Sequence, residues 1–286
     1  MDKMIPNAAM HGRSQEVEPN DRQPPRPDRV RRRRLILTDA VRDEVIPRLL
    51  AKRPAQAAVT EAQIIELADM SLQGHGDEVV AFVTALQKNG FAADTLYLSL
   101  LSPAAALLGQ YWEDDVCNFA DVTIGLVHLQ QAMRALGPAF FSGNALKAPV
   151  GPRALLMPLP GEHHTFGLTM LADFFRRAGW NTWSGTVVDH AALKQMVSAE
   201  SVDLIGFSVA CDNMLDTVRH AIEIVREASR NRDLVVMVGG PPFVVDASHA
   251  RKVGADGTAK DGLQAVAEAQ RLLPRHLKER GRDAAS

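Results

Sequence analysis

Residues 154–167 read ALLMPLPGEHHTFG. The apolar run at the start has the length and composition of a buried strand, and a turn bounded by Gly161 and Gly167 follows it. A helical pattern over residues 168–178 comes next. A strand, a glycine-bounded turn and a helix make up the first half of a βαβ unit, so this stretch predicts a parallel sheet.

The same alternation continues to residue 272. Short aliphatic or β-branched runs recur at 181–184, 204–208, 234–238 and 257–258. Amphipathic helical patterns separate these runs, at 191–199, 214–230, near Ser248 and at 263–272. Five strands alternating with five helices over about 120 residues predict an α/β domain with a doubly wound, five-stranded parallel sheet of the Rossmann-like or flavodoxin-like kind, at 152–273. A ligand on such a sheet lies at the carboxyl ends of the strands.

Before this domain the period is helical. Amphipathic segments with short connections predict an antiparallel helical bundle, which we interpret as a cap domain over residues 38–147. The expected helices begin near Thr60, run over 79–86 to a stop at Gly90, cover 92–112, and cover 121–136. Pro103 is expected to kink or split the third of them.

The net charge of −2 conceals an uneven distribution along the chain. Residues 1–56 hold 13 Lys and Arg against 8 Asp and Glu, whereas the other 230 residues hold 19 against 26. Residues 1–37 are Pro-rich without apolar periodicity and are predicted to be a disordered basic tail, and 274–286 a second disordered tail. Between tail and bundle, a short helix that packs on the body or binds a partner is expected from Val41, Val45, Leu49 and Leu50.

The basic tail carries an arginine cluster that is either a solvated tail or a contact for DNA or an acidic partner. Its members are Arg29, Arg31, Arg32, Arg33 and Arg34. No apolar segment after it is long enough for a signal peptide or a membrane span, so we expect a soluble, cytoplasmic protein. The two cysteines, Cys117 and Cys211, fit a reducing compartment.

Four glycine-containing features fall at the predicted strand ends: 161–167, 206–208, 239–241 and 254–257. In the first, His163 and His164 stand beside Glu162, which is the pattern of a metal ligand oriented by a carboxylate. A tetrahedral zinc site would lack ligands here, whereas a metal already held by a macrocycle needs only one or two axial donors. The alternative is a Rossmann-like domain in which the two histidines merely line a loop.

These motifs together resemble a known family. Gly-Glu-x-His-x-x-Gly at 161–167, Ser208, Gly239-Gly240 and the 254–257 signature are similar, in order and spacing, to the cobalamin-binding domain of methionine synthases, corrinoid proteins and cobalamin-dependent regulators. The resemblance covers about residues 152–272 and implies that the cofactor is cobalamin, as hydroxo- or aquocobalamin.

The resemblance implies base-off, His-on binding. His164 would be the lower axial ligand of cobalt, Glu162 would hydrogen-bond to it, and Ser208 would complete that network. The turn residues Thr165, Phe166 and Gly167 would also contact the cofactor, and Gly239 and Gly240 would line the channel for its dimethylbenzimidazole tail. The chain departs from the family in having Glu162 where Asp is usual, and Leu168-Thr169 where Lys or Asn often follows the last glycine.

The helical segment is consistent with the resemblance, because a four-helix cap commonly precedes such sheets. Residues 108–112 resemble the Leu-Gly-x-x-Trp stretch of these caps, which makes Trp112 a candidate to stack near the upper axial face; a core tryptophan is the alternative. DNA-binding photoreceptors of this superfamily carry an upper-face His after that Trp, where this chain has Glu113, so that class is disfavoured.

A basic N-terminus, the amphipathic segment VIPRLL at 45–50, and the stretch from Trp112 with Phe119, DVT at 121–123 and Leu129-Gln130 together resemble the PpaA/AerR group of regulators. The resemblance implies a light- and redox-responsive antirepressor, not an enzyme, that binds a transcriptional repressor of photosystem genes. The rival is a corrinoid protein that carries methyl groups between methyltransferases, and a third interpretation is a helical adaptor with a vestigial cobalamin fold.

Two further side chains have both a functional and a structural interpretation. His128 on the fourth expected helix is a possible upper axial ligand, although a satisfied histidine in or beside the core is the commoner case. Cys211, three residues after Ser208, is expected to be a buried structural cysteine, with a redox-sensitive thiol as the alternative.

Overall fold

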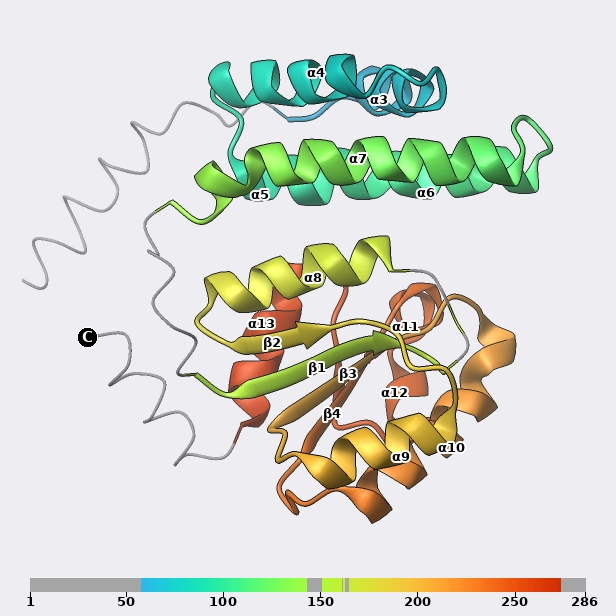
Figure 1. The fold of residues 1–286 in the computed structure, drawn as a ribbon, viewed down its shortest axis with the longest axis vertical. Coiled ribbons are helices and arrows are strands. Elements are labelled where there is room, and N and C mark those ends of the chain that lie inside the picture. Colours follow the sequence, from blue (N-terminus) through green and yellow to red (C-terminus); the bar gives the residue numbers. More distant parts are fainter. Residues whose placement is uncertain (1–57, 143–150, 161, 163–164, 274–286) are drawn as a thin grey trace, which may run out of the picture. The chain divides into compact units, whose positions relative to one another are not determined.

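The computed structural model describes residues 58–142, 151–160, 162 and 165–273 (Figure 1). These all belong to one compact unit, Gln56–Ser286. The predicted tails at 1–37 and 274–286, the arginine cluster and the short helix containing Val41 lie outside the described residues.

The α/β part contains a five-stranded sheet, and all its pairings are parallel. The strands are β1 (Arg153–Pro158), β2 (Asn181–Ser184), β3 (Leu204–Ser208), β4 (Val235–Gly239) and β5 (Gly257–Thr258), in the order β2-β1-β3-β4-β5. This is the flavodoxin-like order, in which β1 and β3 are the neighbours where the direction of winding reverses. The predicted fold class is therefore confirmed.

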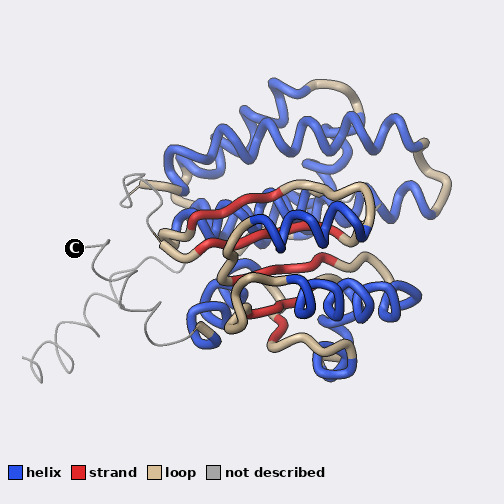
Figure 2. The backbone as a smooth tube through the Cα atoms, turned by 60° about the horizontal axis from the view of Figure 1, so that its bottom comes forward, coloured by secondary structure: helices blue, strands red, loops and turns tan. Residues whose placement is uncertain are grey.

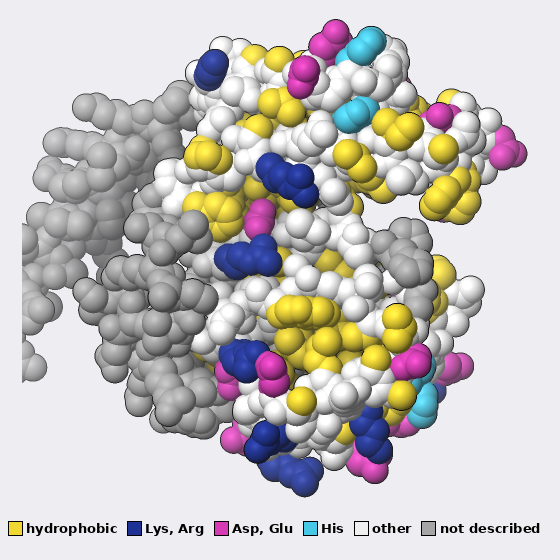
Figure 3. All heavy atoms as spheres, in the orientation of Figure 1, with side chains coloured by type: hydrophobic (Ala, Val, Ile, Leu, Met, Phe, Trp, Pro, Cys, Tyr) yellow, Lys and Arg dark blue, Asp and Glu magenta, His cyan; other side chains and the backbone are white. Residues whose placement is uncertain are grey.

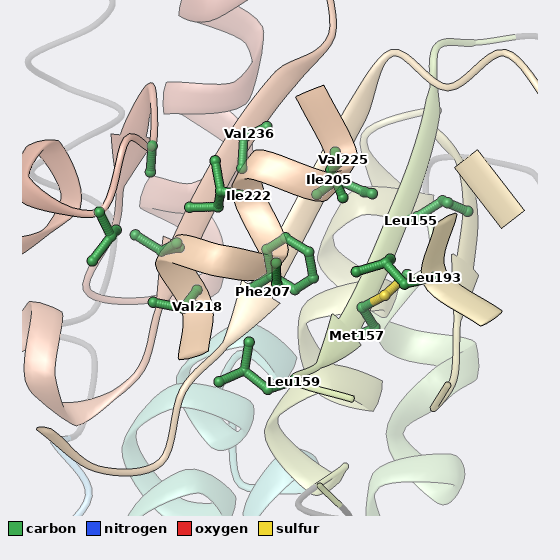
Figure 4. Packing of buried hydrophobic residues seen from close by; sticks show 14 of the residues in the cluster. Leu155, Met157, Leu159, Leu193, Ile205, Phe207, Val218, Ile222, Val225 and Val236 are labelled. Atoms are coloured by element: carbon green, nitrogen blue, oxygen red, sulfur yellow. The ribbon is translucent and has the colours of Figure 1, made fainter. Parts of the chain in front are cut away.

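Helices cover both faces of the sheet (Figure 2). One face packs against α9 (His190–Ala199), α10 (Leu215–Ala228), α11 (Pro241–Val245) and α12 (Ser248–Lys252). Figure 4 shows this core, in which Phe207 of β3 is directed toward Val218 and Ile222 of α10. The opposite face packs against α8 (Phe166–Arg177) and α13 (Gly262–Leu272). With both faces buried, β1, β3 and β4 are continuous apolar runs, as parallel strands usually are.

The cap is a helical bundle. It comprises α3 (Glu61–Leu72), α4 (Gly76–Lys88), α5 (Ala93–Leu96), a π-helix (Tyr97–Leu101), α6 (Ser102–Glu113) and α7 (Phe119–Phe140). Capping boxes at Thr60 and Asn118 start α3 and α7. Pro103 lies in the first turn of α6, directly after the π-helix, so the third expected helix is split where the sequence indicated.

Helix α8 belongs to two cores at once. Leu168, Ala172 and Phe175 pack on the sheet. Phe166, Met170 and Phe174, spaced four residues apart on another side of the helix, are buried in the core of the cap. Because α8 directly follows the 161–167 turn, one rigid helix links that turn to the cap.

The sequence did not indicate α11, which begins at Pro241 after Gly240. Residues 239–241 were expected only as a glycine-containing strand end, but proline is well suited to the first positions of a helix because no intrahelical N–H is needed there. Within the part of the chain that the structure describes, no helix is long and apolar enough to cross a membrane.

Candidate functional site

The register of the sheet places three strand ends in one row. Pro158, Ser208 and Gly239 are the last residues of β1, β3 and β4, and Ser208 pairs with both of the others. The turn 161–167 and Gly240 continue from the outer two of these strands. The predicted site residues therefore meet at one edge of the sheet, next to the winding reversal between β1 and β3.

The two glycines after β4 differ in what surrounds them. Gly240 has φ of 111°, and a Cβ there would collide with the carbonyl oxygen of Val209. A Cβ added at Gly239 would meet no atom within 4 Å, and the same is true at Gly167. Gly240 is required by the backbone, whereas Gly239 and Gly167 leave space open.

That space is part of a cavity of about 680 Å³ between the sheet, α8, α13 and the cap. The predicted residues Gly167, Ser208, Gly239 and Gly240 all line it. Apolar side chains form most of the remaining wall: Leu98, Leu156, Leu168, Met170, Leu171, Phe174, Phe175, Leu204, Phe207, Met237, Val238, Pro241, Ala259 and Ala265. The volume and the few polar groups are typical of a site for an organic ligand.

The turn after β1 is described only in part. Glu162 is half-buried, and its backbone N–H donates to Leu159 O at 2.9 Å. The carbonyl of Thr165 accepts from the backbone N–H of Thr169 at 2.9 Å, which begins α8. Gly161, His163 and His164 lie outside the described residues, so the ligand role of His164 stays a prediction.

Phe166 is placed differently from the other residues of the turn. Its side chain is buried in the core of the cap and does not line the cavity. The structure therefore gives Phe166 a packing role, whereas its neighbour Gly167 faces the ligand space.

On the cap, the end of the α6–α7 hairpin exposes apolar side chains (Figure 3). Trp112 is 46% exposed and meets the ring of Phe119 edge to face, with centroids 6.2 Å apart. Trp112 is therefore not a core residue, which leaves it available to a ligand or a partner.

His128 faces another part of the bundle. Its Nδ1 lies 2.8 Å from the carbonyl oxygen of Ser71 on α3, and its ring lies beside Gly76 at the start of α4. It does not line the cavity. These contacts match the structural interpretation of this histidine.

A polar contact that the sequence did not indicate joins the cap to α8. Tyr97, fully buried in the π-helix, donates its hydroxyl to Met133 O at 3.1 Å and Asp173 Oδ2 at 3.3 Å. Burial raises the pKa of Tyr97, and the Asp173 carboxylate raises it further. Burial also raises the pKa of Asp173, although its ion pair with Arg176 works against that shift.

Arg177, on the next position of α8, adds to this junction. Its guanidinium lies 4.0 Å from the ring centroid of Phe140 and 3.7 Å from Asp94 Oδ2 in the cap.

The prediction for Cys211 was wrong. The side chain is exposed, and its Sγ lies 2.7 Å from Asn213 Oδ1. It follows β3 in a loop at the strand edge, where its position is set by the loop and not by the hydrophobic pattern. Among the described residues, no three His, Cys, Asp or Glu side chains come together as a metal site.

Sequence reasoning also missed the wall that α13 contributes. Gly262 allows close approach of α13 to α8, because a Cβ there would collide with the ring of Phe174. Ala265 lines the cavity one turn further along. The signal was present as small residues at helical spacing, at 262, 265 and 269.

The cavity fits the cofactor that the motifs imply. A corrinoid has a flat heterocyclic base on a flexible nucleotide tail, and the deep, mainly apolar cavity between sheet and helices suits such a group. The glycines leave its wall without Cβ atoms at Gly167 and Gly239, where the backbone can approach a bulky ligand.

Comparison with known proteins agrees with this geometry. Residues 152–267 match the model of the B12 binding domain. The chain is 24% identical over 165 residues to an uncharacterised 20.5 kDa protein from the bchF–crtJ intergenic region of Rhodobacter capsulatus, which is 58% of this chain and 85% of that protein.

A second kind of relative is the dimethylamine corrinoid protein 1 of Methanosarcina acetivorans, which is 29% identical over 114 residues. That match takes in 40% of this chain and about half, 53%, of the relative.

The monomethylamine corrinoid protein of Methanosarcina barkeri has a similar fold, with a TM-score of 0.61 and 17% identity over 75% of this chain and 100% of that one. The match to the B12 binding domain therefore covers the strand ends and most of the residues that line the cavity between sheet, α8 and α13.

Proposed function

We propose that this protein is a cobalamin-dependent transcriptional regulator that acts by binding a repressor of photosystem genes. The observation that carries the cofactor part is the cavity, which opens beside the aligned ends of β1, β3 and β4 and is lined by Gly167, Ser208 and Gly239. In the proposal, His164 would ligate cobalt, and Glu162 and Ser208 would orient its imidazole.

The regulatory part is supported by the relative from the bchF–crtJ intergenic region. The match to this chain covers 85% of that relative. It is also supported by the linkage through α8, which follows the 161–167 turn and packs Phe166, Met170 and Phe174 into the cap. A bound corrinoid would supply an axial coordination site that responds to light and redox state.

A regulator must present two arrangements that its partner distinguishes. In this chain, α8 can transmit a change at the turn to the cap, because the Tyr97–Asp173 hydrogen bond and the Arg177 contacts hold the two together. A tenfold difference in the partner's affinity for the two arrangements requires about 1.4 kcal/mol.

Visible absorbance spectra test the cofactor proposal. Titration of the purified full-length protein with hydroxocobalamin is expected to change the spectrum on binding, and His164→Ala is expected to bind more weakly with a different spectrum. Ser208→Ala, at the cavity wall, should show a smaller effect. Equal affinity and identical spectra for wild type and His164→Ala would show that His164 is not the ligand.

The regulatory proposal is tested by DNA binding of the repressor in the presence of this protein, in light and in darkness. Repressor–DNA affinity is expected to differ between the two conditions only when cobalamin is present. Identical DNA binding in all mixtures would rule out the antirepressor function and leave cobalamin binding intact.

The second candidate is a corrinoid protein that carries methyl groups, which the identity to the dimethylamine corrinoid protein favours. Incubation of the cobalt(I) protein with a methyl donor and a corrinoid methyltransferase distinguishes the two. Sustained methyl transfer supports the carrier, whereas a light-dependent effect on the repressor without methyl transfer supports the regulator.

A further inference from the structure

The cavity is lined by few polar side chains, and three of them lie at its solvent-exposed rim. These are Ser99 of the π-helix, Ser102 of α6 and Lys260 after β5, all of which are exposed and line the cavity. The deeper wall is made of aliphatic and aromatic side chains from the sheet, α8 and α13. The cavity therefore has an apolar interior and a polar rim that carries one cation.

Among the described residues, Lys260 is the only basic one that lines the cavity. Among the described residues, no carboxylate forms an ion pair with it. In the part of the chain that the structure describes, its neighbour Asp261 is the only acidic lining residue, and one oxygen of that carboxylate accepts the backbone N–H of Gln264 at 2.8 Å. Asp261 thus caps α13, an eleven-residue helix whose positive N-terminal end adjoins the same rim.

We propose that Lys260, with Ser99 and Ser102, binds the anionic phosphodiester that links the corrin ring of a complete corrinoid to its nucleotide base. The inference rests on the proposed corrinoid binding and adds a recognition site for one chemical group of the ligand. It also predicts a selectivity, for corrinoids that carry the nucleotide over those that lack it.

The division of the cavity into interior and rim is the physical reason. A flat base gains by leaving water for the apolar interior, whereas an unpaired anion placed there would lose its hydration without compensation. The charged linker must therefore stay at the rim, where a lysine ammonium can pair with it and two hydroxyls can donate hydrogen bonds.

The rim contains groups from both parts of the described unit. Ser99 and Ser102 belong to the cap, and Lys260 belongs to the α/β part. A phosphodiester bound by all three would connect cap and sheet through the ligand, in addition to the connection through α8. The nucleotide tail would then stabilise the cap against the sheet.

The test compares two ligands on the full-length, cofactor-free protein. Aquocobalamin has the phosphodiester and base, and diaquocobinamide lacks both. Dissociation constants are measured by visible absorbance for wild type, Lys260→Gln, Lys260→Arg and the control Lys194→Gln, which removes an exposed lysine on α9 at the other face of the sheet.

Lys260→Gln is expected to weaken aquocobalamin binding about two- to tenfold and to leave diaquocobinamide binding unchanged, as for the loss of one partly exposed charge pair. Lys260→Arg should retain the affinity, and Lys194→Gln should match wild type. Because salt screens an exposed pair, the difference between wild type and Lys260→Gln should shrink at 0.5 M salt.

The double substitution Ser99→Ala with Ser102→Ala should weaken aquocobalamin binding in the same selective way. Equal weakening of both ligands by Lys260→Gln, or no weakening of either, would overturn the assignment while cobalamin binding stands. Failure of the wild-type protein to bind either ligand would overturn the proposed function itself.

Discussion

Two adjacent glycines at the end of β4 give a test at the scale of single residues. Gly239→Ala adds a methyl group where no atom lies within 4 Å, so the free energy of unfolding should change little. The methyl group projects toward the ligand space, so cobalamin affinity should fall. Gly240→Ala must strain a backbone at φ of 111° and displace Val209, so it should lower the free energy of unfolding by about 1–3 kcal/mol.

Urea denaturation of the cofactor-free variants and cobalamin titration together measure both effects. Each glycine serves as the control for the other, because the substitutions are identical and adjacent. A loss of stability in Gly239→Ala as large as in Gly240→Ala would contradict the assignment of open ligand space to Gly239.

Asp173 gives a prediction about pH. Burial raises the pKa of this carboxyl in the folded protein. A group with a raised folded pKa contributes stability that is complete below its unfolded pKa, about 3.9, and is lost as the pH rises through the folded value. Compared with Asp173→Asn, the wild-type protein should therefore lose free energy of unfolding as the pH rises above about 4.

Urea denaturation of both proteins at several pH values measures this difference. The comparison cancels the titration of every other group that the two proteins share. A difference that stays constant with pH would mean that the ion pair with Arg176 cancels the effect of burial on Asp173, and a difference that increases with pH would mean that the ion pair outweighs burial.

At the scale of elements, α8 determines whether the cap and the α/β part unfold together. Phe174 is 2% exposed, and its ring meets those of Phe140 and Tyr97 at centroid distances of 4.9 and 6.0 Å. Phe174→Ala should cost about 3–5 kcal/mol, the usual range for a buried phenylalanine. Phe119→Ala, at a side chain that is 70% exposed, is the control and should cost far less.

Because α8 belongs to both cores, helix content and tryptophan fluorescence should report one transition in the wild-type protein and in Phe174→Ala. Trp180 and Trp183 in the α/β part and Trp112 in the cap provide the fluorescence signals. Two separated transitions in the wild-type protein would mean that the cap is stable without α8.

The elements could be predicted because their patterns are local. Strand and helix periods indicated all five strands and the split at Pro103, and parallel pairing then required that Ser208 and Gly239 meet. Helix α11 was missed because proline favours both turns and helix starts. The double role of α8 was visible only as two interleaved apolar faces, and a sequence pattern does not say which neighbour each face meets.

The sequence predicts which residues of the strand ends lie at the cavity, but it does not predict the residues that other elements contribute. Gly167, Ser208, Gly239 and Gly240 line the cavity because their positions follow from the sheet, and their contact with cobalamin stays a prediction. The side chain of Phe166 lies in the core of the cap, and Lys260 lines the cavity. Both positions depend on packing between helices that are distant in the sequence, which a local pattern does not reveal. The exposure of Cys211 depends on a loop, for which hydrophobic pattern carries no information.

At the scale of the molecule, the described residues between 58 and 273 form three hydrophobic cores among themselves, two on the faces of the sheet and one in the cap. A protein shortened to 58–273 is therefore expected to fold and to bind hydroxocobalamin with the affinity of the full-length protein. Circular dichroism and visible absorbance titration measure the two properties. Loss of cobalamin binding with an intact fold would show that residues outside 58–273 contribute to the site.

The close packing of α8 on α13 at Phe174 and Gly262 has a kinetic consequence. Helices α8 and α13 form part of the cavity wall and are held close by that contact, so a group seated between them is expected to leave faster when the two helices separate. Dissociation should then be slow even where association is fast, and the residence time should exceed that of a ligand held at an open surface. A protein molecule would therefore keep its bound corrinoid for some time after the concentration of free corrinoid falls. Its occupancy would then reflect the earlier corrinoid concentration and not the current one.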